Sequence, residues 1–336
     1  MVLERFHSDQ RWENQPARGW SIDDLDEDEI VRTVNDAVRQ GGLEDPGSRK
    51  PADLLRGLGV LQDGVLLRAA LLVFGKRKRL EFEMPQCLLR VARIRGVEPL
   101  VFLDNWQFRG NAFSLLARAE WFLMDTLPNV TRSREGRSAP TDEPLFPALA
   151  TREALANALC HRDYSDGGGS IAVAVIDDRL EITSTGPLHF GLTPRTLFGP
   201  HMSKPWNPLV ANPFYRRGIT ENWGAGTIKM VRLKRSAGLP RPEIEDSGLS
   251  VTVRFRPNGR IAHPSAGYGP INRQEVILGL LGFMPSGLAF REICAKLAGG
   301  ATERQVRRAL TDVRNRGRVP PTGRGRASRW VRTWRD

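Results

Sequence analysis

The chain of 336 residues has little cysteine and no long apolar run. Its three cysteines, Cys87, Cys160 and Cys294, lie far apart and form no CxxC motif, which argues against a disulfide framework or a zinc site. Such cysteine use suits a reducing compartment, so we expect a cytoplasmic location. No apolar run approaches the roughly 18 residues that span a bilayer, and the polar N-terminus lacks the apolar core of a signal peptide. We therefore expect no membrane partner.

Acidic residues are scarce relative to basic ones, above all near the C-terminus. The formal net charge is +12, and residues 301–336 contain eleven Arg but only three acidic residues, a net charge of +8. A basic patch this local favours a polyanionic partner, most often nucleic acid. A disordered basic tail would explain the composition equally well.

Breaker-rich segments divide the chain into three compact regions. The second region has the order helix, hairpin, loop, helix, strand, which predicts an α+β fold with helices on a mainly antiparallel sheet. The expected boundaries are an N-terminal α/β domain at 1–127, a linker at 128–146, the α+β domain at 147–257, a linker at 258–270, and a small C-terminal domain at 271–336.

The C-terminal domain shows three short helical patterns and then two β segments joined by a Gly/Arg turn, which predicts a winged helix-turn-helix. In its third helix, Val306, Leu310 and Val313 share one face and would pack inward. The opposite face suits the major groove of duplex DNA, and the wing would lie near the backbone or minor groove. A solvated helix in a protein–protein module is the alternative. The residues expected to contact nucleic acid are Arg304, Arg307, Arg308, Thr311, Asn315, Arg324, Arg326 and Arg329.

The helix-forming run REALANALC, which starts at residue 152, carries Glu153 and Asn157 one turn apart. This spacing places both side chains on one helix face. A carboxylate that activates water and an amide that binds Mg²⁺ beside a triphosphate need such a juxtaposition. Most Glu/Asn pairs at this spacing are merely solvated, so the spacing alone does not decide between a solvated pair and a functional one.

Three segments further along the chain favour a nucleotide site. The run STG (184–186) ends a predicted strand with a glycine that allows close backbone approach to a ligand. The run WGAG (223–226) opens a predicted helix, whose first amides can receive phosphate oxygens. Thr252 lies in the middle of a predicted strand. This order is that of the Bergerat ATP-binding fold.

Residues 152–255 resemble the GHKL-type ATPase domain of bacterial RecG-like proteins and transcriptional regulators. Two upstream runs, LGVLQDGVLLRAALLVFGK and FLDNWQFRGN, are also similar to this family, so the resemblance covers most of the chain. The matching runs within the domain are REALANALCHRDYS, DDRLEITSTGPLHFGLTP, NPLVANPFYRRGITENWGAGTIKM and GLPRPEIEDSGLSVTVRF.

The resemblance implies ATP and Mg²⁺ as ligands. It makes Glu153 the general base, Asn157 the Mg²⁺ ligand and Ser184 the residue at the adenine position. Backbone contacts to the nucleotide are implied for Gly186, Gly224 and Gly226, and a place near adenine for Thr252.

The chain departs from the family pattern in two ways. GHKL enzymes usually carry Asp where this chain has Ser184, and a hydroxyl is a weaker acceptor for the adenine amino group. The usual N-terminal Schlafen/Alba-like DNA-binding domain is not evident, so we expect either a short member or a piece of a longer protein. The run His161-Arg162-Asp163-Tyr164 is a family hallmark, and it is either part of the site or a hydrogen-bonded helix cap.

Three functions agree with these features: a nucleotide-responsive DNA-binding regulator, a slow ATPase in a nucleic-acid or defence process, and a pseudo-ATPase scaffold that binds DNA. A homodimer is compatible with each. The chain contains no G-x-x-x-x-G-K-[ST] phosphate loop, so we do not expect a helicase motor.

Overall fold

The chain divides into two compact units, Met1–His263 and Pro264–Asp336. None of the helices in the described ranges has both the length and the apolarity needed to cross a bilayer. The computed structural model describes residues 11–96, 101–132, 141–199, 201–202, 204–220, 226–261, 288–296, 303–315, 321–322 and 329–330.

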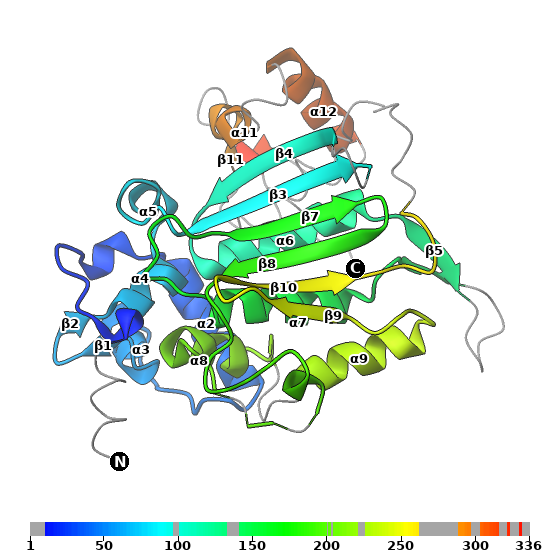
Figure 1. The fold of residues 1–336 in the computed structure, drawn as a ribbon. Coiled ribbons are helices and arrows are strands. Elements are labelled where there is room, and N and C mark those ends of the chain that lie inside the picture. Colours follow the sequence, from blue (N-terminus) through cyan, green and yellow to red (C-terminus); the bar gives the residue numbers. More distant parts are fainter. Residues whose placement is uncertain are drawn as a thin grey trace. The chain divides into compact units, whose positions relative to one another are not determined.

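The first unit is built on a six-stranded mixed sheet with the strand order β4-β3-β7-β8-β10-β9 (Figure 1). Strands β3 and β7 are parallel, and the other neighbouring strands are antiparallel. The expected hairpin is confirmed, because β7 and β8 pair along their whole length and join at Asp177 and Asp178. The strands are β3 (Leu88–Arg95), β4 (Val101–Arg109), β7 (Ile171–Ile176), β8 (Arg179–Thr185), β9 (Glu243–Asp246) and β10 (Ser250–Phe255).

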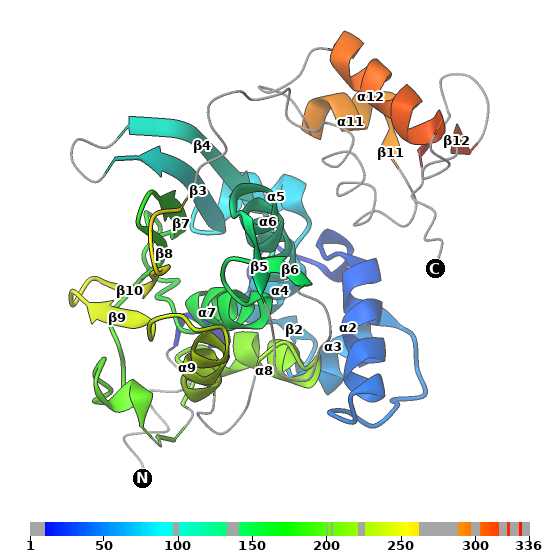
Figure 2. The ribbon, with the colours of Figure 1, turned by 90° about the vertical axis from the view of Figure 1, so that its right-hand side faces the viewer.

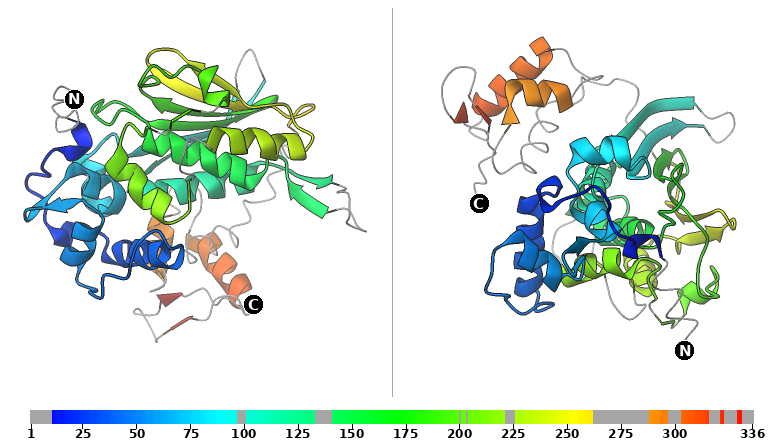
Figure 3. Two further views of the ribbon diagram at one scale, coloured as in Figure 1. Left: turned by 90° about the horizontal axis from the view of Figure 1, so that it is seen from below. Right: turned by 90° about the vertical axis from the view of Figure 1, so that its left-hand side faces the viewer.

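Three helices pack on one face of this sheet: α6 (Ala112–Thr126), α7 (Ala148–Cys160) and α9 (Gly226–Ser236) (Figures 2 and 3). Helix α6 begins directly after Asn111, because the Asn111 side chain accepts a hydrogen bond from the Ser114 amide and caps the first turn. Helix α7 is apolar on almost every side because it is enclosed by α6, α8, α9 and the sheet.

Smaller elements extend the core away from the sheet. They pack against the helices that cover the sheet: Phe113 of α6, for example, stacks on Phe214 of α8 with ring centroids 4.7 Å apart. These elements are α2 (Glu27–Arg39), α3 (Pro51–Gly57), α4 (Arg68–Phe74), α5 (Arg77–Glu83), α8 (Pro208–Arg216), the hairpin β1 (Leu61–Gln62) and β2 (Val65–Leu66), and the 3-10 helices η1 (Trp12–Asn14), η2 (Ile22–Asp24) and η3 (Thr196–Phe198).

The first unit does not follow the expected division into domains at 1–127 and 147–257. Strands β3 and β4, which precede the expected linker, lie in the same sheet as the four strands that follow it. One hydrophobic core includes Leu25, Val91 and Phe255, from both sides of the linker. The expected linker itself contains a hairpin of β5 (Asn129–Arg132) and β6 (Thr141–Pro144). The parallel pairing of β3 with β7 explains this, because parallel neighbours need a long crossover, here through α6 and α7.

Helix α8 and strand β9 are elements that the sequence patterns do not predict. Pro213 lies inside α8 and is ordinarily a sign against a helix. Pro208 occupies the first turn, where proline is favoured, and Phe214 is fully buried. Tertiary packing therefore stabilises a helix that local propensity disfavours.

The second unit contains the last two of the three expected C-terminal helices, while the first, at 272–283, lies outside the described residues. In α12, Val306, Leu310 and Val313 are buried as predicted. The strands form a three-stranded antiparallel sheet in the order β11-β13-β12. The described elements are β11 (Leu288–Ala289), α11 (Phe290–Lys296), α12 (Glu303–Asn315), β12 (Pro321–Thr322) and β13 (Arg329–Trp330).

Candidate functional site

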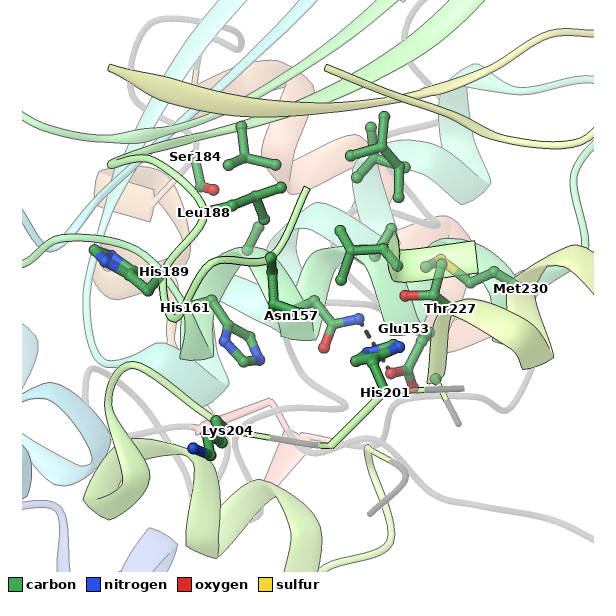
Figure 4. A pocket seen from close by; sticks show the side chains of 18 of the residues that line it. Glu153, Asn157, His161, Ser184, Leu188, His189, His201, Lys204, Thr227 and Met230 are labelled. Carbon is green, nitrogen blue, oxygen red and sulfur yellow. Dashed lines mark hydrogen bonds between the residues drawn. The ribbon is translucent and has the colours of Figure 1, made fainter. Parts of the chain in front are cut away.

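A cavity of about 120 Å³ lies between α7, α9, strands β8 to β10 and the loop that joins β8 to α8 (Figure 4). Four residues that the sequence singles out line it together: Glu153, Asn157, Ser184 and Gly226. The sheet contributes mainly apolar side chains, whereas α7 and the loop contribute most of the polar ones. The volume is below the roughly 300 Å³ at the lower end of small-molecule pockets.

Glu153 and Asn157 form a hydrogen-bonded pair on the cavity side of α7. Asn157 donates from Nδ2 to Glu153 Oε1 at 3.1 Å, so its carbonyl oxygen, Oδ1, is left to accept from other groups. Glu153 is only 4% exposed. A Cβ atom placed on Gly226 would lie 2.0 Å from Glu153 Oε1, so the start of α9 packs directly against this carboxylate. A glycine is needed there to leave room for it.

The run from residue 161 to 164 leads from α7 to the sheet and is mainly structural. The buried Arg162 donates from Nη1 to the Gln86 carbonyl oxygen at 2.7 Å, and its guanidinium lies over the Tyr164 ring. Tyr164 donates its hydroxyl proton to the Leu159 carbonyl oxygen. The Asp163 amide donates to the Thr185 carbonyl oxygen. Arg162 thus joins the end of α7 to the residues just before β3, Asp163 joins it to β8, and Tyr164 bonds back to α7 itself.

His161, the remaining member of this run, has its side chain in the cavity. It is the C-cap of α7 and follows Asn157 by four residues, so Glu153, Asn157 and His161 lie on one side of the helix axis at successive turns. Burial lowers the pKa of His161 to about 4, with further contributions from His189 and His201. Its imidazole is therefore neutral at pH 7.

The loop between β8 and α8 contributes further polar groups that the sequence does not single out. His189, His201 and Lys204 line the cavity. The His189 ring stacks on Trp206 with centroids 3.5 Å apart, and burial lowers the pKa of His189. The spacing from Asn157 to His161 is a local signal in the sequence. For the loop residues no such signal exists, because the course of the loop brings them to the cavity.

Gly186 and Thr252 do not line the cavity, contrary to the roles that the resemblance implies. Gly186 has a φ of +101°, and a Cβ atom there would lie 2.9 Å from the Asp163 amide nitrogen. This glycine therefore permits close packing of two backbone segments. The Thr252 hydroxyl lies 2.9 Å from the Thr183 hydroxyl, on the face of the sheet opposite Ser184, because neighbouring strand residues point to opposite faces. Gly224 lies outside the described residues.

On α12, Arg304, Arg307, Arg308 and Thr311 are exposed, and the Arg307 guanidinium lies over the Phe290 ring at 4.1 Å. Asn315 is the last residue of α12 and Arg329 the first of β13, but neither side chain is described. Arg324 and Arg326 lie outside the described residues.

Comparison with known proteins relates four of the six strands of the sheet to one family. Residues 168–255 match the family described as "Putative ATP-dependent DNA helicase recG C-terminal". This range runs from just before β7 to the end of β10 and covers about a quarter of the chain. These residues form a RecG-related, ATPase-like domain, which suggests nucleotide binding. Helix α7, with Glu153 and Asn157, precedes the matched range.

No curated protein matches the chain. Among solved structures, the chain is similar to the DIP2311 protein from Corynebacterium diphtheriae, with a TM-score of 0.58 and 20% identity. The match covers 98% of this chain and 66% of that one, so this chain spans just under two thirds of its length. At this identity the similarity shows the fold alone.

Proposed function

We propose that this protein is a nucleotide-responsive DNA-binding protein, which binds ATP with Mg²⁺ in the cavity and contacts duplex DNA through its second unit. The observation that carries the nucleotide part is the convergence of Glu153, Asn157, Ser184 and Gly226 on one cavity, from three separate elements. The ATPase-like domain at 168–255 supports it, and so does the resemblance to the Bergerat fold.

The groups in the cavity suit a nucleotide and its metal. The apolar side chains of β8 to β10 suit a base, and the polar side chains of α7 and the loop suit phosphates. The Asn157 carbonyl oxygen is the kind of oxygen ligand that Mg²⁺ takes, and its hydrogen bond to Glu153 orients the amide. When bound, Mg²⁺ neutralises phosphate charge. Glu153 would accept a proton from the attacking water in any hydrolysis.

The small volume of the cavity implies that nucleotide entry moves the loop between β8 and α8. Phe190 in this loop has a φ of +59°, a conformation that is strained for a bulky residue. Its side chain is nonetheless 45% exposed. An outward shift of this loop would enlarge the cavity and provide a conformational change that reports nucleotide binding.

The DNA part of the proposal rests on the second unit. The strand order β11-β13-β12, with α11 and α12 between the first two strands in sequence, is compatible with a winged helix. Helix α12 buries its apolar face and exposes Arg304, Arg308 and Arg314. The net charge of +8 over residues 301–336 suits a polyanion.

Calorimetric titration of the full chain with ATP tests the nucleotide part. We expect Asn157→Ala to weaken binding at least tenfold in Mg²⁺ and much less in EDTA, because the metal contact is lost. Glu153→Gln should bind ATP but abolish any hydrolysis, since a general base acts on the attacking water. Thr252→Val, on the opposite face of the sheet, is the matched control and should bind normally. Unchanged binding by Asn157→Ala would contradict the metal-ligand role.

A pseudo-ATPase scaffold is the second candidate, and the small cavity together with Ser184 at the adenine position favours it. Absence of binding at millimolar ATP would support this candidate over the first. Binding with turnover that Glu153→Gln abolishes would support the slow ATPase instead.

A further inference from the structure

The two ends of the cavity differ in chemistry. Strands β8, β9 and β10 line one end with Ile182, Ile244, Val251 and Val253, and Ser184 is the one polar side chain that they add. At the other end lie the side chains of His161, His201 and Lys204, beyond Asn157 (Figure 4). These last three residues are called the basic cluster below.

Ser184 presents a neutral and unengaged hydroxyl to the apolar end. The residue is 6% exposed and its hydroxyl points into the cavity. This hydroxyl forms no hydrogen bond with any residue that the structure describes. A hydroxyl can rotate to accept a proton from an amino group or to donate its own to a carbonyl oxygen. A carboxylate at this position would accept from the adenine amino group and repel the carbonyl oxygen of guanine. The hydroxyl serves both bases.

The positive charge of the basic cluster comes from Lys204, while the neutral imidazole of His161 can donate a hydrogen bond. Glu153 is the one carboxylate among the described residues that line the cavity, and it is hydrogen-bonded to Asn157. Lys204 forms no ion pair with a described carboxylate, and its ammonium lies 5.8 Å from the centre of the Phe190 ring. The titratable groups that act on His161 are the neighbouring imidazoles of His189 and His201, so none of them is a carboxylate. No group of three His, Cys, Asp or Glu residues in the described part of the chain could hold a metal ion. An anion suits this end better than a metal.

We propose that the cavity selects its nucleotide by the polyphosphate and not by the base: the basic cluster holds the phosphates, and Ser184 serves adenine and guanine alike. This inference rests on the proposed nucleotide binding and names its substrate class, purine nucleoside triphosphates. Sites that engage a substrate with dedicated buried polar groups discriminate by about 10⁴ or more, whereas apolar pockets discriminate far less. Because each base can form one neutral hydrogen bond with Ser184, we expect ATP and GTP to bind within about tenfold of each other.

Titration of the full chain with ATP, GTP and inorganic tripolyphosphate tests the inference. All substitutions are made in the Arg304→Glu/Arg308→Glu variant, which serves as the parent protein. Its lower positive charge reduces unwanted binding of the anionic ligands to the basic C-terminal segment. His161→Gln and Lys204→Ala should each weaken all three ligands by about tenfold or more and leave the ATP to GTP ratio unchanged. Ser184→Asp should shift that ratio at least tenfold toward ATP and leave tripolyphosphate unaffected. Thr252→Val is the control for a substitution off the cavity, and melting temperatures show that each variant is folded.

The outcomes separate this inference from the proposed function. A preference for ATP over GTP above about a hundredfold would overturn the part assigned to Ser184. If ATP binds but tripolyphosphate does not, or if His161→Gln and Lys204→Ala leave the tripolyphosphate affinity unchanged, then the basic cluster does not hold the phosphates. Binding of tripolyphosphate through the cluster, with no binding of either nucleotide, would instead defeat the proposed function and reduce the cavity to an anion site.

Discussion

Single residues of unusual burial connect the parts of the first unit. Arg162 is among the largest fully buried side chains, and its bond to the Gln86 carbonyl oxygen links the end of α7 to the start of β3. A Cβ atom on Gly169 would lie 2.9 Å from Arg162 Nη2. Gly169 therefore leaves room for the buried guanidinium of Arg162. This explains why a glycine is needed shortly after the polar run that ends α7.

Glu13 is the residue from which we expect a pH-dependent stability. It is fully buried, and its Oε2 atom accepts a hydrogen bond from the Val210 amide in the first turn of α8. Burial raises the pKa of Glu13 to about 7, despite the opposing effect of hydrogen bonds from the Leu209 and Val210 amides. The pKa of Glu13 is higher in the folded protein than in the unfolded chain. Its contribution to the free energy of unfolding is therefore fully present below about pH 4.5 and is lost as pH rises through 7.

Glu13→Gln should therefore be more stable than the parent at pH 8 by up to about 3 kcal/mol and nearly equal to it at pH 4.5. Urea unfolding at several pH values measures this difference. Glu44→Gln, at an exposed position, is the matched control and should follow the parent at every pH. A parent protein whose stability is flat between pH 5 and 8 would contradict the prediction.

At the scale of elements, the contact between α7 and α9 decides the shape of the cavity. Helix α9 begins at Gly226, which lies against the Glu153 carboxylate, so the two helices are close only because this position has no side chain. A methyl group there would displace Glu153 from its bond with Asn157 or push α9 away.

Gly226→Ala should lower the free energy of unfolding by about 1–2 kcal/mol, because overpacking outweighs the gain from alanine in a helix. In a Glu153→Ala background the same substitution should be neutral or stabilising, since the clashing atoms are gone. Urea unfolding of the parent protein, the two single variants and the double variant gives the coupling energy directly. Gly259→Ala, where a Cβ atom meets nothing within 4 Å, is the control. If Gly226→Ala and Glu153→Ala change the free energy of unfolding additively, then the Glu153 carboxylate is not the group for which Gly226 leaves room.

At the scale of the whole molecule, the proposed function requires that the two units communicate. We expect the full chain to bind duplex DNA with a steep salt dependence, in which each phosphate contact adds about 0.9 to the slope of log K against log salt. Arg304→Glu/Arg308→Glu should lower both the affinity and the slope, because both arginines are exposed on α12. Fluorescence anisotropy over a series of salt concentrations measures both.

Arg18→Glu/Arg260→Glu changes the net charge equally at exposed positions of the first unit and serves as the control. Tight binding by the α12 variant would contradict the recognition-helix assignment. A DNA affinity that ATP with Mg²⁺ leaves unchanged would show that the two units act independently, which the scaffold alternative predicts.

The sequence by itself determined the elements whose signals are local. The hairpin of β7 and β8 and the apolar face of α12 both appear where the sequence patterns predict them. The one-turn spacing of Glu153 and Asn157 likewise sufficed to place both on one face of α7. Such signals act between residues a few positions apart, so they do not depend on the rest of the fold.

Only the tertiary structure decided which distant residues meet. The parallel pairing of β3 with β7 merged two expected domains into one sheet. The register of β10 on β8 turned Thr252 away from the cavity and brought Val251 and Val253 into it. The course of one loop added His201 and Lys204. Strand pairing and register depend on long-range packing, and a shift of one residue reverses the face of every side chain, so no local pattern specifies them.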